Sequence, residues 1–91
     1  MHAIHRYVVP IGQPMKLTLS GNPLAVVSRR YGELDFWAEA EVDNMDPVAD
    51  RLFMVVGTGH PLPENLAPRW YWGTAVDQND LVWHLIEIRN Y

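Results

Sequence analysis

Residues 57–63, which read Gly-Thr-Gly-His-Pro-Leu-Pro, contain the residue types best suited to chemistry in this sequence. Glycine lets a backbone approach a ligand closely, so Gly57, Gly59 and the imidazole of His60 form a candidate binding loop. The loop lacks the closing Gly-Lys-Ser/Thr of a phosphate-binding loop and the third glycine of a dinucleotide fold. A structural role is the favoured interpretation: the two glycines supply positive φ angles where a strand ends, and the two prolines stiffen the exit.

Other catalytic and metal-binding patterns are weak. A metal site needs three or four converging ligands, and the histidines (His2, His5, His60 and His84) show no established ligand spacing. His84 is expected to make hydrogen bonds on one face of a strand. Neither serine lies in a Gly-x-Ser-x-Gly elbow, and no cysteine is present to act as a nucleophile. The sequence therefore predicts a protein that is not an enzyme and that needs no metal or cofactor.

An acidic stretch is the second candidate surface. Residues 32–50 contain no Lys or Arg and hold seven of the eleven Asp and Glu residues. Strand alternation places four acids on one face together with an aromatic side chain: Asp35, Trp37, Glu39, Glu41 and Asp43. A large aromatic on a solvent-facing acidic stripe is typical of an interface for a basic protein partner. The alternative is that Trp37 packs under a neighbouring loop while the acids only keep the sheet soluble.

Period-2 alternation of apolar and polar residues dominates the chain and predicts strands rather than helices. The expected strands are residues 7–9, 15–20, 24–29, 34–42, 51–56, 70–76 and 81–88, with one helical turn at 48–50. Short turns at 31–33 and 77–80 predict that 24–29 pairs with 34–42, and 70–76 with 81–88, as antiparallel hairpins. The continuous apolar character of 51–56 predicts a strand that is buried on both faces. Trp70, Trp72 and Trp83 should fill space within the last hairpin or the core. These elements predict an all-β fold with little helix, a small antiparallel sandwich or barrel of about seven short strands, built as one domain from residues 1–91.

Composition limits the classes of function. The net charge of −4 and the single adjacent basic pair, Arg29-Arg30, argue against binding to a nucleic-acid backbone. The longest apolar run, residues 52–56, is much shorter than the roughly 20 residues that span a bilayer. The lack of cysteine and of a secretion signal predicts a soluble protein of the cytoplasm with no membrane partner. An edge strand near Pro10 makes a homodimer the expected oligomeric state.

Several short motifs, taken in order, carry a resemblance to a known group of proteins. They are Arg-Tyr-Val-Val-Pro at 6–10, Leu34-x-x-Trp37-Ala38, the segment 57–63, Tyr-Trp-Gly-Thr at 71–74 and Leu-Val-Trp-His at 81–84. The chain resembles a family of small uncharacterised proteins encoded by bacteriophages and prophages. The resemblance covers nearly the whole chain and is most specific at 57–63, whereas around residues 65–70 this chain carries extra residues. It implies an accessory protein that acts in the cytoplasm of a bacterial host, and it assigns no catalytic residue.

The residues and the resemblance together predict a non-enzymatic phage protein that binds another protein, a host or phage factor. One alternative is a structural component of the virion or an assembly factor. The other is a module that sequesters a small molecule or a nucleotide in a pocket lined by Gly57, Gly59 and nearby tryptophans.

Overall fold

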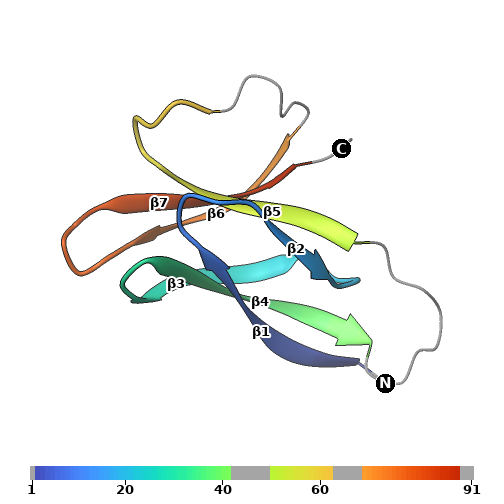
Figure 1. Cartoon of the computed structure of the whole chain (residues 1–91). Coiled ribbons are helices and arrows are strands. Elements are labelled where there is room, and N and C mark those ends of the chain that lie inside the picture. Colours follow the sequence, from blue (N-terminus) through green and yellow to red (C-terminus); the bar gives the residue numbers. More distant parts are fainter. Residues whose placement is uncertain (1, 42–49, 63–68, 89–91) are drawn as a thin grey trace.

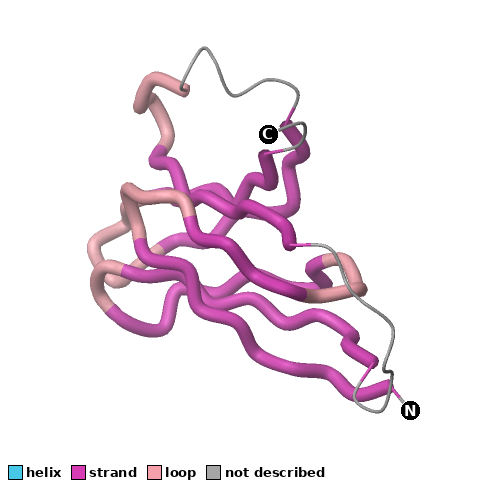
Figure 2. Tube along the Cα trace, turned by 45° about the vertical axis from the view of Figure 1, so that its right-hand side comes forward, coloured by secondary structure: helices cyan, strands magenta, loops and turns pink. Residues whose placement is uncertain are grey.

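The computed structural model describes residues 2–41, 50–62 and 69–88, and this part of the chain forms seven strands and no helix (Figure 1). The strands are β1 (His2–Pro10), β2 (Met15–Thr18), β3 (Pro23–Arg30), β4 (Glu33–Glu41), β5 (Asp50–Gly57), β6 (Arg69–Val76) and β7 (Val82–Ile88). They make two antiparallel sheets that pack face to face as a small sandwich (Figure 2). The all-β prediction is confirmed, and of the two predicted architectures the sandwich is correct and the closed barrel is not.

The two sheets have different strand orders. The three-stranded sheet has the order β1-β4-β3, and the four-stranded sheet has the order β2-β5-β7-β6. Both predicted hairpins are present, because β3 pairs with β4 and β6 pairs with β7. The remaining three pairs, β1 with β4, β2 with β5 and β5 with β7, join strands that do not follow each other in sequence. The chain therefore crosses between the sheets after β1, after β2 and after β4.

Most strand boundaries differ from the sequence-based expectation by one or two residues, and two elements differ more. Strand β1 begins at His2 rather than at residue 7, because all nine of its residues find partners along the long strand β4. The helical turn expected at 48–50 lies mostly outside the described residues, and Asp50 is the first residue of β5. Pairing with a partner strand thus extends elements beyond the reach of a local pattern.

The core lies between the sheets and follows the predicted alternation of β4. Leu34, Phe36 and Ala38 point inward and are almost completely buried. The Phe36 ring stacks on Tyr7 of β1 at a centroid distance of 5.2 Å and meets Phe53 of the opposite sheet at 5.1 Å. Each such buried apolar side chain stabilises the fold by about 1.5–3 kcal/mol relative to exposure. The contact between Phe36 and Phe53 therefore joins the two sheets.

Strand β5 is buried on both faces, as its continuous apolar sequence predicts. Phe53 and Val55 face the core, and Val56 on the opposite face is only 9% exposed. On the neighbouring strand β7, Ile86 and Ile88 lie on that same outer face and are also buried. The two central strands of the four-stranded sheet thus carry buried apolar side chains on both faces.

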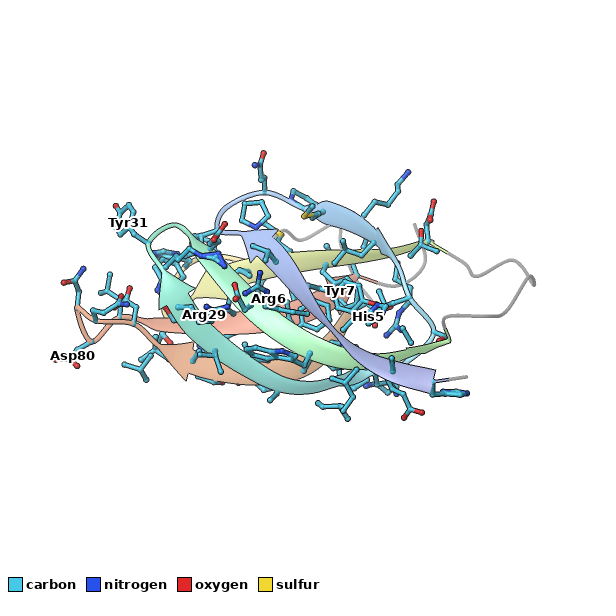
Figure 3. All side chains as sticks on the ribbon, turned by 90° about the horizontal axis from the view of Figure 1, so that it is seen from below. His5, Arg6, Tyr7, Arg29, Tyr31 and Asp80 are labelled. Atoms are coloured by element: carbon cyan, nitrogen blue, oxygen red, sulfur yellow. The ribbon has the colours of Figure 1, made fainter. Side chains whose placement is uncertain are left out.

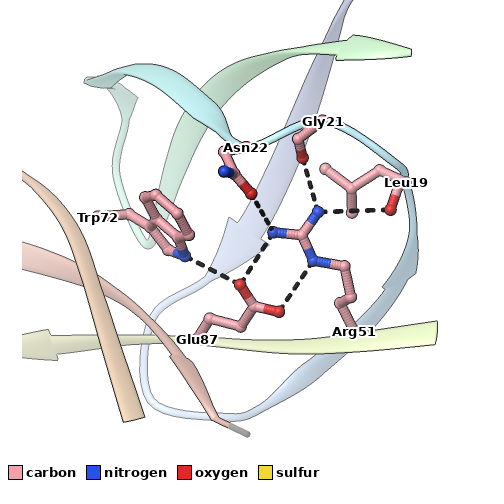
Figure 4. Close-up of polar contacts among 6 residues, drawn as sticks. All are labelled: Leu19, Gly21, Asn22, Arg51, Trp72 and Glu87. Atoms are coloured by element: carbon pink, nitrogen blue, oxygen red, sulfur yellow. Dashed lines mark hydrogen bonds and ion pairs between the residues drawn. The ribbon is translucent and has the colours of Figure 1, made fainter. Parts of the chain in front are cut away.

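A polar network joins the four-stranded sheet to the connection between β2 and β3 (Figure 4). Arg51 on β5 pairs with Glu87 on β7, and the Trp72 indole N–H donates to the same carboxylate at 3.0 Å. The Arg51 guanidinium also donates to the carbonyl of Gly21 at 2.6 Å and to the side chain of Asn22 at 3.1 Å. One buried carboxylate and one guanidinium therefore fix the β2–β3 connection onto the four-stranded sheet.

Candidate functional site

The acidic stripe expected on β4 is not a uniformly acidic surface. Asp35 lies on the outer face of the three-stranded sheet, as alternation predicts, but it is 0% exposed. The expectation that Asp35 faces solvent is therefore wrong. Its neighbours across the sheet explain why. Val8 on β1 and Val27 on β3 pair with Asp35, and Arg6 and Arg29 lie two residues from them on the same face, so their side chains lie over it.

Three arginines converge on the Asp35 carboxylate. Its Oδ2 atom lies 3.2 Å from Arg29 Nη1, 3.6 Å from Arg30 Nη2 and 3.9 Å from Arg6 Nε. The arginine side chains themselves are 44–45% exposed, so one face of this cluster is open to solvent. Figure 3 looks onto this face and shows Arg6 and Arg29 side by side near the middle of the sheet. The Oδ1 atom of Asp35 is buried and has no hydrogen-bond partner among the described residues.

Apolar side chains surround this cluster on the same face. Ile4 on β1 is 63% exposed and Val27 on β3 is 40% exposed, while Trp37 on β4 is half-buried between the two outer strands. Exposed Glu39 lies 2.7 Å from the imidazole of His2. We call this surface, made by Ile4, Arg6, Val27, Arg29, Arg30 and Trp37, the arginine face. Asp43 and the side chain of Glu41 lie outside the described residues, so the predicted stripe is placed only for Asp35, Trp37 and Glu39.

The 57–63 segment begins as a tight turn attached to β7. The His60 N–H donates to the Gly57 carbonyl at 3.1 Å, and the Thr58 N–H donates to the Val82 carbonyl at 3.1 Å. Gly59 has a φ of +85°, as predicted, but Gly57 does not have a positive φ. Gly57 is required for a steric reason instead, because a Cβ atom there would lie 2.7 Å from the His60 ring. Pro63 lies outside the described residues.

His60 and Trp83 form the contact that closes this turn. Their rings meet edge to face at a centroid distance of 5.9 Å. The indole N–H of Trp83 donates to Asp77 Oδ2 at 3.0 Å, which fixes the other end of the ring system. That hydrogen bond, with those from the backbone N–H groups of Leu81 and Asn79, lowers the pKa of Asp77 below its ordinary value of 3.8.

His84 is hydrogen-bonded on one sheet face, as predicted. Its Nε2 atom lies 2.7 Å from the Thr58 hydroxyl, and its Nδ1 atom lies 3.1 Å from the Thr74 hydroxyl and 3.2 Å from the Tyr71 hydroxyl. A hydroxyl can donate or accept, so this cluster satisfies both ring nitrogens. His84 therefore ties the Thr58 turn to β6 and β7.

Two adjoining hollows open at the end of the sandwich beside this turn. The first, of about 370 Å³, is lined by Gly57, Thr58, His60, Asp80, Leu81, Val82 and Trp83. The second, of about 350 Å³, is lined by Ile11, Tyr31, Gly32, Asp77, Leu81 and Trp83. They share Leu81 and Trp83, so one indole is a wall of both. A further hollow of about 300 Å³ on the outer face of the four-stranded sheet contains Gly57, Gly59, His60 and His84 but no tryptophan.

The described residues contain no group of three or more His, Asp or Glu side chains that could hold a metal ion. In the same part of the chain, no helix is long and apolar enough to cross a membrane.

A family model described as "Domain of unknown function (DUF7352)" matches residues 1–90. The chain belongs to this family. The comparison with curated proteins and the comparison with solved structures each found no match.

The side chains that contact the candidate residues are harder to predict from the sequence than the candidate residues themselves. The arginine cluster had one signal, the adjacent pair Arg29-Arg30, but nothing local to Asp35 indicated that these side chains would cover it. Asp77, Asp80 and Tyr31 were expected only as turn residues, yet they line the hollows at the end of the sandwich. Trp72 and Trp83 pack against the core as expected, whereas Trp70 is 52% exposed and does not.

Proposed function

We propose that this protein is a non-enzymatic binding module that docks a protein partner on the arginine face. The observation that carries the proposal is the cluster of three half-exposed arginines held over buried Asp35. The resemblance of the 57–63 motif to phage proteins supports a setting inside a bacterial host. There the module would act as a phage-encoded accessory protein on a host or phage factor.

The electrostatics of the face favour an acidic partner rather than the basic one expected from the sequence. Among the described residues, the three arginines contact two carboxylates, Asp35 beneath the cluster and Glu33, which Arg30 binds at 3.0 Å. Three guanidinium charges therefore exceed two carboxylate charges. Each guanidinium has five N–H donors, and those donors are not exhausted by the contacts with Asp35 and Glu33. Donors fixed in advance by a buried carboxylate lose less side-chain entropy on binding.

The apolar side chains beside the arginines supply the second component of a protein interface. Ile4 and Val27 are exposed large apolar residues on a sheet face that no other element covers among the described residues. Trp37 between them matches the aromatic residues enriched among interface anchors. A partner segment with Asp or Glu side chains next to apolar ones would complement both features.

The test combines capture with direct binding. The immobilised protein would capture candidate partners from a lysate of a bacterial host, and each candidate would then be purified and titrated against variants by calorimetry. We expect Ile4→Ser, Arg6→Gln and Trp37→Ala each to lower the affinity for a true partner by about tenfold. The loss of affinity from Arg6→Gln should be smaller at high salt than at low salt. Val76→Ser, which changes an exposed residue on the other sheet, is the matched control.

Capture alone does not support the proposal. It is supported only if the arginine-face variants lose affinity while Val76→Ser does not and circular dichroism shows that all variants remain folded. A purified partner that binds all four variants as tightly as the wild type would show that the interface lies elsewhere.

A further inference from the structure

The two hollows at the end of the sandwich form one groove around a single indole. Trp83 and Leu81 line both hollows, His60 bounds the groove on one side, and Tyr31 bounds it on the other. Tyr31 is 92% exposed and Leu81 is 52% exposed, so apolar surface at the rim is open to solvent. Figure 3 shows Tyr31 and Asp80 at the same end of the molecule, away from Arg6 and Arg29. We call this feature the end groove.

The charges that line the end groove are all negative. Among the described residues that line it, Asp77 and Asp80 are the acidic ones, and none is Lys or Arg. The Asp77 carboxylate is held in place by the Trp83 indole and by the backbone of the β6–β7 turn. Asp80 has a φ of 62°, in the left-handed region, and its side chain makes no hydrogen bond or ion pair within the described part of the chain. A free carboxylate thus lies at the rim of an aromatic-walled hollow.

The geometry of the aromatic side chains is fixed. The Trp83 ring is held at one end by Asp77 and at the other by its contacts with Gly57 and His60. Among aromatic side chains, tryptophan binds cations over its ring face most strongly. A hollow of about 370 Å³ is at the small end of the usual range for ligand sites, which suits a compact cation rather than a large cofactor.

We propose that the end groove binds a small organic cation, an alkylated ammonium or a guanidinium group, against Trp83 with Asp80 as its counter-ion. This site is separate from the arginine face and does not depend on it. The cation could belong to a free small molecule or to a basic side chain of a protein, and the chemistry of recognition is the same.

The experiment is an NMR titration of the ¹⁵N-labelled protein that follows the indole N–H resonance of Trp83. The probes are tetramethylammonium, choline and methylguanidine, and 3,3-dimethylbutan-1-ol is the neutral isostere of choline. We expect saturable shifts with the cations and an affinity about tenfold lower for the neutral alcohol. The alcohol carries no charge, so it makes neither a cation–π contact with Trp83 nor an ion pair with Asp80. Equal binding of choline and the neutral alcohol would overturn the proposal.

Variants separate this site from general electrostatics. Asp80→Asn should lower the affinity for choline by about threefold to tenfold. Glu39→Gln removes the same charge from the other sheet and should leave the affinity for choline unchanged. Trp83→Phe keeps an aromatic core residue and should weaken binding by a similar factor. If Asp80→Asn binds choline as the wild type does, or if no cation gives a saturable shift, the assignment is wrong.

Peptides distinguish the two sources of the cation. A peptide with a trimethyl-lysine or an arginine that binds more than about tenfold tighter than the free cation would identify a protein ligand. A peptide that binds no tighter than choline would identify a free small molecule. Either result retains the proposed recognition chemistry.

Discussion

Arg51 on β5 and Glu87 on β7 form a bidentate ion pair within the four-stranded sheet, with Nε–Oε2 at 2.8 Å and Nη2–Oε1 at 2.9 Å. Glu87 is 2% exposed and the Arg51 side chain 14% exposed, so water contributes little to their solvation. Burial of such a pair costs solvation free energy, which the pair recovers only because its geometry is good and neighbouring groups satisfy the remaining donors. The pair therefore has two roles: it positions the β2–β3 connection, and it contributes to the stability of the protein.

Replacing one member of this ion pair should lower the free energy of unfolding more than replacing both members with apolar residues. We expect Arg51→Met alone to lower the free energy of unfolding by about 3 kcal/mol, because the buried Glu87 carboxylate loses the guanidinium that pairs with it. The double variant Arg51→Met/Glu87→Leu should lose less than the single one. Urea unfolding followed by tryptophan fluorescence measures both. A double variant that loses the sum of the two single losses would contradict a coupled pair.

The arginine cluster gives a second stability prediction. Asp35→Asn removes the charge that holds Arg6, Arg29 and Arg30 together, and we expect it to lower the free energy of unfolding by about 1–3 kcal/mol. Added salt should restore part of the loss, because it screens the repulsion among the arginines. Glu39→Gln, at an exposed acid of the same strand, should change stability by less than about 0.5 kcal/mol. Equal effects at the two positions would mean that the cluster does not stabilise the fold.

The two glycines of the turn should differ in their tolerance of asparagine. Gly59 needs a left-handed backbone, which asparagine adopts readily, and nothing lies within 4 Å of its missing Cβ. Gly57 does not need a left-handed backbone, but the His60 ring occupies the space that a Cβ atom would take. Gly57→Asn must therefore displace the imidazole from Trp83. We expect Gly59→Asn to be nearly neutral and Gly57→Asn to cost about 1–3 kcal/mol. Thermal unfolding and the ring-current shift of the His60 protons test this, and equal losses would contradict it.

The hydrogen bond from Trp83 to Asp77 predicts a measurable pKa. Carboxyl NMR should give a pKa for Asp77 below 3.8, and Trp83→Phe, which removes the largest cause, should move the pKa back toward that value. Because the folded pKa lies below the unfolded one, ionised Asp77 stabilises the fold above about pH 4. That contribution is lost as the pH falls through the folded pKa. A pKa for Asp77 that is the same in wild type and Trp83→Phe would rule out the indole as its cause.

The elements of this fold were predictable because each depends on local geometry. Alternation in residues 34–42 is a property of the extended backbone, so Leu34, Phe36 and Ala38 could be assigned to the core without a structure. The turns at 31–32 and 77–80 were equally visible, and with them the two hairpins. Burial of β5 on both faces followed from its unbroken apolar run.

The sequence by itself thus determined the strands, the two hairpins and the inward side of β4, whereas the tertiary structure decided every candidate site. Cross-strand register alone puts Arg6 and Arg29 over Asp35, which turned an expected acidic stripe into an arginine cluster. Docking of the turn on β7 alone puts His60 against Trp83 and closes the end groove. Alternation fixes the side on which a residue lies, but its charge partners come from strands distant in sequence, and only the packed sheets bring them together.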